Sequence, residues 1–163
     1  MSCRCSCRLI CWYSGISVEG ITIEPSPKWL QDRLLECDLR PINNIVDISN
    51  YVMLELGIPN HIFDRDKIND GQIIIRPAGS NQKFTTLDEV ERELLAKDTV
   101  VADSNKPLVI AGIMGGLESG VTENTTNIFI ESANWIDVET RKTSTRLGLR
   151  TDSSQRYDKK RRC

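Results

Sequence analysis

Three short segments carry side chains whose types suit chemistry better than plain structure. The first surrounds His61, the only histidine, which follows Gly57 and Pro59, residue types that commonly end a helix. A loop histidine at a helix end can act as a general base or as a polar anchor. The alternative is a structural histidine that is hydrogen-bonded to the backbone or to Asp64.

The second segment is a glycine cluster, residues 111–116 (AGIMGG), which directly follows an apolar run. Glycines there let the chain turn sharply or let a ligand lie against the backbone. The segment therefore predicts either a simple turn or the wall of a narrow pocket. A phosphate-binding loop is the weakest interpretation, because the glycine spacing differs from that of nucleotide-binding motifs and no phosphate-contacting lysine follows.

The third segment contains Glu131, which ends the apolar run 128–130 and precedes Ser132. A carboxylate beside a buried strand is costly unless it is paired or serves a ligand. Glu131 is therefore a candidate pocket residue. The alternative is a glutamate at a strand end that reaches solvent.

Helices are expected to precede these segments. Ser26 and Pro27 predict the start of a first helix, because serine is a common cap and proline suits the first turn. One face of that helix would carry the following side chains: Trp29, Leu30, Leu34, Leu35 and Cys37.

A second, mostly buried helix is expected after a cap at Asn43 or Asn44, with a stop at Gly57. Its apolar residues at helical spacing are Ile45, Ile48, Val52 and Leu56.

A last helix is expected near the C-terminal end of the chain. Asp137 is expected to cap it, and it ends near Gly148.

Strands dominate the middle of the chain. The alternation of residues 16–23 around Gly20 predicts a half-buried strand with a possible bulge. Apolar runs between turn residues predict four more strands, at 72–76, 99–102, 108–111 and 128–131. The order predicts an α+β fold, a layered β-sheet or sandwich core flanked by helices at the start and end of the domain.

Composition fits one cytoplasmic domain. The 163 residues are 39% hydrophobic and 27% charged, without an apolar run that could span a membrane. The net charge of −2 is unevenly placed, since nine Lys/Arg oppose Asp152 and Asp158 after residue 140. We expect any RNA to bind through this end, by a patch of basic side chains: Arg141, Lys142, Arg146, Arg150 and Arg156.

Both chain ends have an unusual composition. Four cysteines lie within residues 1–11 and another is Cys163, which leaves only Cys37 in the body. Their spacing does not fit a zinc site, so no metal site is expected. A disulfide framework is not expected either, because a domain of this size with an ordinary core does not need one and nothing suggests an oxidising compartment. Residues 1–11 are interpreted as a Cys/Arg-rich tail and 159–163 as a basic tail, which is a solvated end in the simplest interpretation.

Taken together, the ordered motifs resemble a known family. The sequence resembles the editing region of the bacterial phenylalanyl-tRNA synthetase (phenylalanine-tRNA ligase) β subunit, over residues 12–158. The motifs are SPKWLQ (26–31), RPINNIVDISNYVMLELG (40–57), Pro59, His61, Phe63-Asp64, TLD (86–88), AGIMGG (111–116), ESA (131–133) and RLGLRTD (146–152).

The resemblance implies a proofreading esterase, which hydrolyses tyrosine wrongly esterified to the tRNA for phenylalanine. It implies catalytic roles for His61 and Glu131, with substrate-binding positions at Ser49, Asn50, Ala111, Gly112, Gly115, Thr151 and Ser153. It also implies three partners: the acceptor end of that tRNA, the remainder of the β subunit and the α subunit. No cofactor, membrane or DNA partner is expected here, because ATP and magnesium belong to the synthetic site elsewhere in the parent enzyme.

An acidic residue suits this task. A pocket built around an unpaired hydrogen-bonding group accepts tyrosine, whose hydroxyl satisfies it, and rejects phenylalanine, which does not. Glu131 is the candidate reader. Water is the expected nucleophile, positioned by His61, by backbone groups or by the terminal ribose hydroxyl.

Some positions depart from the family pattern. Ile58 replaces a glutamine, Asn60 and Ile62 flank His61 in place of a hydrophobe and an alanine, Ser49 replaces a threonine, and Ser153 replaces an alanine. These changes bear on pocket size and tyrosine preference. The alternative function is a non-catalytic fragment that binds RNA or another subunit.

Overall fold

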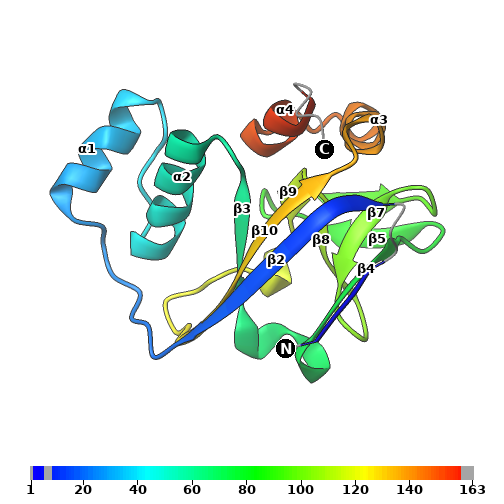
Figure 1. Cartoon of the computed structure of the whole chain (residues 1–163), viewed down its shortest axis with the longest axis horizontal. Helices are drawn as coiled ribbons and strands as arrows, with labels where there is room; N and C mark the ends of the chain where they lie inside the picture. Colours follow the sequence, from blue (N-terminus) through cyan, green and yellow to red (C-terminus); the bar gives the residue numbers. More distant parts are fainter. Residues whose placement is uncertain (1, 6–8, 159–163) are drawn as a thin grey trace.

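The computed structural model describes residues 2–5 and 9–158 and has an α+β fold (Figure 1). The expected fold class is confirmed. The predicted basic tail, residues 159–163, lies outside the described residues. In the described part of the chain, no helix is both long and apolar enough to cross a membrane.

The strands are β1 (Ser2–Cys5), β2 (Ile10–Glu19), β3 (Asn60–Asp64), β4 (Gln72–Pro77), β5 (Gln82–Thr85), β6 (Glu91–Leu94), β7 (Thr99–Ala102), β8 (Pro107–Ile110), β9 (Met114–Gly115) and β10 (Asn127–Trp135). The helices are α1 (Lys28–Glu36), α2 (Asn44–Leu56), α3 (Asp137–Leu147) and α4 (Asp152–Asp158), with short 3₁₀ turns η1 (Arg65–Lys67), η2 (Asn69–Gly71) and η3 (Leu117–Ser119). In Figure 1, α1 and α2 lie together on one side of the strands, and α3 and α4 lie together at another.

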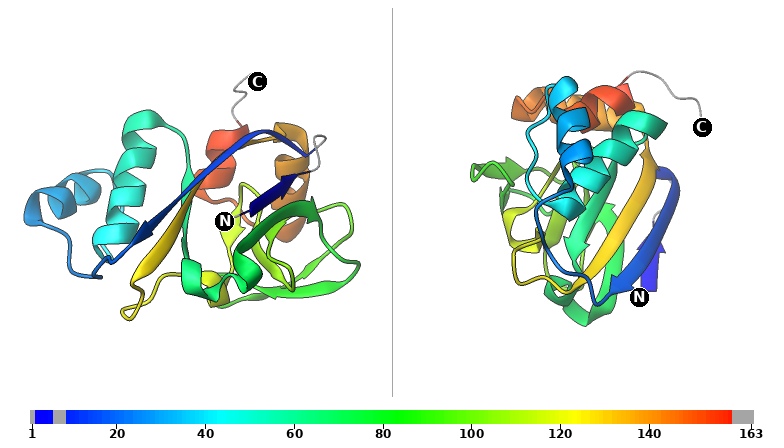
Figure 2. Two further views of the ribbon diagram at one scale, coloured as in Figure 1. Left: turned by 60° about the horizontal axis from the view of Figure 1, so that its bottom comes forward. Right: turned by 90° about the vertical axis from the view of Figure 1, so that its left-hand side faces the viewer.

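The strands form a five-stranded sheet in the order β1-β4-β7-β8-β9, a three-stranded sheet in the order β2-β10-β3, and the hairpin β5-β6. Figure 2 shows β10 between β2 and β3 from two further sides. Phe129 and Trp135 of the three-stranded sheet share one buried cluster with Ile73 and Val101 of the five-stranded sheet. The core is therefore a two-layered sandwich, as expected. A second cluster, with Val100 and Ile110, covers the other face of the five-stranded sheet.

The first strand of the body lies earlier than predicted. β2 ends at Glu19, and Gly20 follows it with a left-handed φ of +71°. Pairing with β10 decides this boundary, since Glu19 is the last residue in register, opposite Asn127. β10 itself is longer than the predicted 128–131. Cys11, within β2, is disulfide-bonded although the composition favours no disulfide framework.

The predicted start of α1 was wrong in detail. Pro27 is the N-cap and has no side-chain acceptor for a cap bond, while the Ser26 hydroxyl donates to Asp47 Oδ2 at 2.5 Å and does not cap the helix. The predicted apolar face is also divided. Leu30 and Leu34 are buried, whereas Trp29, Leu35 and Cys37 are exposed.

Both ends of α2 lie where the sequence predicted, but the helix is not mostly buried as expected. Asn43 caps the helix by accepting from Val46 N, and Gly57 ends it in the left-handed conformation. Only Asp47 and Met53 of this helix are buried, and Leu56 is 63% exposed. α2 packs mainly against α1 and β3, and its apolar side chains Ile48 and Val52 are exposed as well.

The C-terminal region contains one helix more than expected. Asp137 is the first residue of α3, not its cap, while the predicted stop at Gly148 is confirmed by its φ of +65°. α4 was missed, as were β3 and the β5-β6 hairpin. The start of α4 is specified by Thr151 and Ser154, whose side chains each accept a hydrogen bond from the other's backbone N–H.

Candidate functional site

The two candidate catalytic residues, Glu131 and His61, lie opposite each other on neighbouring strands. Glu131 of β10 is in register with His61 of β3 on one side and with Gly15 of β2 on the other. Directly paired residues of antiparallel strands place their side chains on the same face of the sheet. His61 therefore lies in a strand, not in the loop that the sequence predicted, and the register brings it beside Glu131.

The Glu131 side chain is buried in the middle of β10, not at a strand end near solvent. It is 4% exposed, and its Oε2 accepts a hydrogen bond from the Tyr13 hydroxyl at 3.0 Å. Burial raises the pKa of Glu131 to about 7, while the Tyr13 hydrogen bond acts in the opposite direction. The carboxyl group can therefore exchange its proton near neutral pH.

His61 is an unsatisfied buried group. Its Nε2 is buried and has no hydrogen-bond partner in the described part of the chain, and its ring packs edge-on to Phe63 at 4.5 Å. Burial lowers the pKa of His61 to about 4, so the ring is neutral at pH 7. A neutral imidazole has one nitrogen free to accept and one N–H to donate. A nitrogen of this kind would gain a hydrogen bond from a ligand or water that reached it.

The glycine cluster leaves room for two aromatic rings, those of His61 and Trp135. A Cβ atom at Gly115 would lie 2.9 Å from His61 Nε2, and one at Gly112 would lie 2.8 Å from Trp135 Cδ1. Gly112 also has a φ of +68°, which disfavours other residues. The glycines form both of the predicted features, a turn between β8 and β9 and a pocket wall.

The first turn of α4 closes the same region. The Thr151 hydroxyl donates to Ile113 O at 2.8 Å, and the Ser153 hydroxyl donates to Gly112 O at 3.1 Å. Both predicted side chains therefore attach α4 to the glycine turn. Because they use their protons there, they contribute to the site as walls and as acceptors.

These groups surround a cavity of about 310 Å³, which we call the Glu131 cavity. Its size lies at the low end of the range of about 300–1,000 Å³ that is usual for small-molecule pockets. Seven of the predicted residues line it: Asn50, His61, Gly112, Gly115, Glu131, Thr151 and Ser153. The described residues include no group of three or more His, Cys, Asp or Glu side chains that could hold a metal ion.

Two predicted positions do not line the Glu131 cavity. The Ser49 hydroxyl donates to Asn60 Oδ1 at 2.6 Å, and Asn60 Nδ2 donates back to Ser49 O at 3.1 Å, so this pair joins α2 to β3. Ala111 is buried in the cluster between the sheets. Both lie next to lining residues in the chain, Asn50 and Gly112.

The sequence reasoning missed several lining residues. Trp135 and Tyr157 give the Glu131 cavity an aromatic side, and Leu87 and Met114 also line it. Tyr157 donates to Ala133 O at 2.8 Å, which holds α4 on β10. An aromatic residue near a strand end was the only signal for Trp135, and it is equally typical of a core residue.

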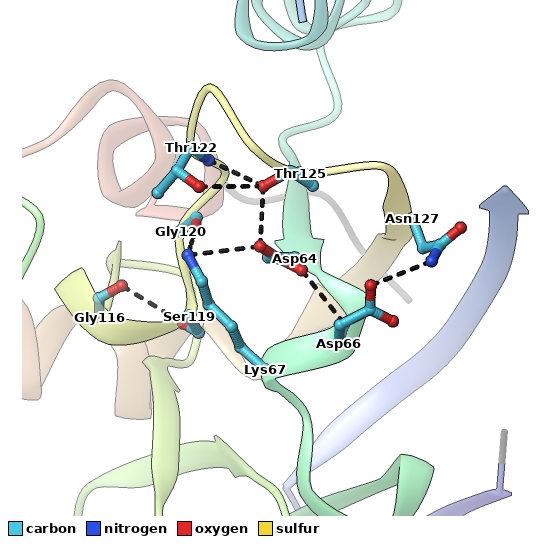
Figure 3. Close-up of polar contacts among 9 residues, drawn as sticks. All are labelled: Asp64, Asp66, Lys67, Gly116, Ser119, Gly120, Thr122, Thr125 and Asn127. Carbon is cyan, nitrogen blue, oxygen red and sulfur yellow. Dashed lines mark hydrogen bonds and ion pairs between the residues drawn. The ribbon is translucent and has the colours of Figure 1, made fainter. Parts of the chain in front are cut away.

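A polar network fixes the strand register on which the site depends (Figure 3). Asp64, at the end of β3, accepts from Thr125 Oγ1 at 2.7 Å and pairs with Lys67 Nζ at 3.4 Å. Lys67 Nζ also donates to Gly120 O at 2.7 Å. The chain entering β10 is thereby held against the end of β3, three residues from the His61–Glu131 pair.

The predicted basic patch divides into groups with different surroundings. Arg146 pairs with Asp98, which is completely buried and also accepts from Thr143 Oγ1. Lys142 pairs with Glu139 on the surface of α3. Arg141 and Arg150 are exposed beside the junction of α3 and α4, and Arg156 is half-buried on α4.

Comparisons with known proteins agree with this architecture. A family model described as the B3/4 domain matches residues 10–162. The phenylalanine–tRNA ligase beta subunits of Staphylococcus aureus strains bovine RF122 / ET3-1 and Mu50 / ATCC 700699 are each 52% identical to this chain over 148 residues, which cover 91% of this chain. The chain spans only 18% of the length of these relatives.

One solved structure shows the same fold. It is a crystal structure of an N-terminal fragment of the phenylalanyl-tRNA synthetase beta-subunit from Pyrococcus horikoshii, with a TM-score of 0.58 and 19% identity. The match covers 90% of this chain and 48% of that fragment. With nearly its whole length matched by the family model, this chain belongs to the B3/4 domain family and is similar to one part of the synthetase beta subunit.

Proposed function

We propose that the Glu131 cavity binds tyrosine esterified to the 3′ end of the tRNA for phenylalanine and hydrolyses that ester. The observation that carries the proposal is a buried carboxyl group in the wall of a cavity, beside a neutral histidine whose Nε2 has no partner among the described residues. Buried polar groups of this kind cost stability, so they are expected to serve a ligand. The similarity to phenylalanine–tRNA ligase beta subunits supports the choice of substrate.

Selection of tyrosine over phenylalanine would follow from the hydrogen bond that only tyrosine can make with Glu131. The phenol of a bound tyrosine would donate to Glu131 or accept from its protonated form. Phenylalanine offers neither, so its ring would displace water from the carboxyl group and supply no hydrogen bond in exchange, which leaves the Tyr13 bond unsupplemented. A hydrogen bond to a charged group contributes about 1.5–3 kcal/mol, which corresponds to a preference of roughly 10- to 100-fold.

The reaction needs only water as a co-substrate. The water oxygen attacks the ester carbonyl carbon, the bond from that carbon to the ribose oxygen breaks, and a proton passes to the ribose oxygen. The products are tyrosine and a tRNA with a free terminal hydroxyl. His61 is neutral and can orient the water, and backbone groups of the glycine turn or the ribose hydroxyl can do the same.

Deacylation assays test this proposal. Wild-type chain, Glu131→Ala and His61→Ala are compared on tyrosine-charged and phenylalanine-charged tRNA. We expect faster hydrolysis of the tyrosine ester by the wild type and loss of most of that preference in Glu131→Ala. Glu123→Ala, which removes an exposed glutamate on a loop, is the control and should keep the preference.

Two results would contradict the proposal. Equal hydrolysis of both esters by the wild type would remove the selection mechanism. No hydrolysis by a folded wild-type chain would favour the alternative function, a non-catalytic module that binds RNA or another subunit. The exposed apolar residues of α1 and α2, including Trp29 and Leu56, favour a protein-contacting role for that side of the molecule.

A further inference from the structure

A second hollow lies between α3 and α4, close to the Glu131 cavity but separate from it. It has a volume of about 270 Å³, and we call it the α3–α4 hollow. Its lining residues are Arg141, Ser144, Thr145, Gly148, Arg150, Ser154 and Gln155. Figure 1 shows the two helices side by side at the C-terminal end of the described chain.

The described part of this lining carries positive charge. Arg141 and Arg150 are the only ionisable side chains among the described residues that line it. Guanidinium groups bind phosphate oxygens in a planar, bidentate manner. The lining therefore suits an anion, and a phosphate group in particular.

The hydroxyl groups of the hollow mainly shape it. Ser144 Oγ donates to Leu149 O, and Ser154 Oγ donates to Thr151 O at 3.0 Å. These bonds hold the end of α3 and the first turn of α4 in place. Thr145 and Gln155 add polar groups at the rim, so binding energy would come chiefly from the two arginines.

The position of the hollow indicates which phosphate it would hold. Consecutive residues of α4 face the two spaces, since Ser153 lines the Glu131 cavity and Ser154 lines the α3–α4 hollow. One helix, about 10 Å across with its side chains, separates them. An extended single-stranded end can cross such a distance with its last nucleotides.

We propose that the α3–α4 hollow binds a backbone phosphate of an RNA 3′ end, just before the nucleotide whose esterified amino acid enters the Glu131 cavity. This site rests on the proposed function for its position and on its own lining for its chemistry. Of the five basic side chains expected to bind RNA, only Arg141 and Arg150 line this site in the described part of the chain. Arg146 holds α3 to the buried Asp98, and Lys142 pairs with Glu139 on the surface of α3.

Binding of a short RNA hairpin with an unpaired 3′ end tests the site without any chemistry. The full chain and its variants are titrated by fluorescence anisotropy at several salt concentrations. We expect Arg150→Ala and Arg141→Ala each to weaken binding by roughly tenfold and to lower the slope of log K against log salt by about 0.7, the value for one lost contact to a single strand. Lys142→Ala, the matched control on α3, should change affinity less than twofold.

A second measurement separates this proposal from the function of the cavity. Arg150→Ala should raise KM for tyrosine-charged tRNA and leave hydrolysis of tyrosine ethyl ester unchanged, because that small ester carries no phosphate. An equal loss of affinity in Lys142→Ala and Arg150→Ala would overturn the site, since it would indicate diffuse attraction. A loss of ethyl-ester hydrolysis in Arg150→Ala would also overturn it. If the wild type hydrolyses neither ester, the proposed function fails, and the hairpin titration still decides whether the phosphate site exists.

Discussion

The Tyr13 hydroxyl donates a hydrogen bond of 3.0 Å to Glu131 Oε2 from the neighbouring strand β2. Tyr13 also packs edge-on against Trp135, with ring centroids 6.5 Å apart. A side chain held in this way limits the rotation of the carboxyl group that it contacts. Because the hydroxyl donates, it favours the ionised form of Glu131 against the effect of burial.

Tyr13→Phe should therefore raise the pKa of Glu131 above its value of about 7. A hydrogen bond to a charged group contributes about 1.5–3 kcal/mol, which predicts a rise of roughly one to two units. Carbon-13 NMR of the Glu131 carboxyl group across a pH titration measures it. Tyr157→Phe is the control, because that hydroxyl donates to Ala133 O and Pro59 O instead. An unchanged Glu131 titration in Tyr13→Phe would show that the hydrogen bond is absent in solution.

Glu131→Gln should stabilise the protein at alkaline pH. The pKa of Glu131 is raised on folding from 4.5 to about 7, so its contribution to stability is complete below pH 4.5 and is lost as pH rises through 7. At pH 8 the variant should be more stable than the wild type by up to about 3 kcal/mol, and the difference should vanish near pH 4. Urea unfolding at both pH values measures this difference. A constant difference would mean that Glu131 does not titrate on folding as described.

His61 should remain neutral well below the usual pKa of histidine. Burial lowers its pKa from 6.5 to about 4, so its contribution to stability is complete above pH 6.5 and is lost as pH falls toward 4. Since His61 is the only histidine, its ring proton signals can be followed without assignment mutants. A titration midpoint near 6.5 in a folded sample would contradict the buried, unpartnered placement of Nε2.

Gly115→Ala should damage the Glu131 cavity. The new Cβ would lie 2.9 Å from His61 Nε2, so the ring must move, at a cost to stability of about 1–3 kcal/mol. We expect a raised KM for the tyrosine ester and a lower melting temperature. Gly79→Ala is the control, because its Cβ would meet only the flexible Gln82 side chain at 3.4 Å. Equal effects of the two substitutions would remove the argument that Gly115 makes room for His61.

Arg146→Ala should lower the free energy of unfolding, whatever its effect on RNA binding. The substitution leaves Asp98 buried and without its cationic partner, which typically costs about 3–5 kcal/mol for a buried pair. Thermal and urea unfolding measure the loss. Lys142→Ala removes an exposed ion pair and should cost less than about 1 kcal/mol. A small effect of Arg146→Ala would return this arginine to the candidates for direct RNA contact.

Local chemistry made part of the fold predictable. The caps at Asn43, Gly57 and Gly148 follow from side-chain and backbone preferences within a few residues, and the structure has all three. Ser26 shows the limit of such reasoning. Its hydroxyl could cap α1, but tertiary packing places it beside the buried Asp47. The burial of α2 was wrong for the same reason, since a hydrophobic face shows what could be buried and not what covers it.

The sequence by itself determined the family, the fold class and the residue types available for chemistry, because motifs and periodicity are local properties of the chain. Tertiary structure decided which of these residues meet. His61 and Glu131 lie far apart in the chain and become neighbours only through the antiparallel register of β3 and β10. That register follows from the packing of both strands and from Asp64 and Thr125 at their ends. Their shifted pKa values follow in turn from burial, a property of the assembled core that no local pattern encodes.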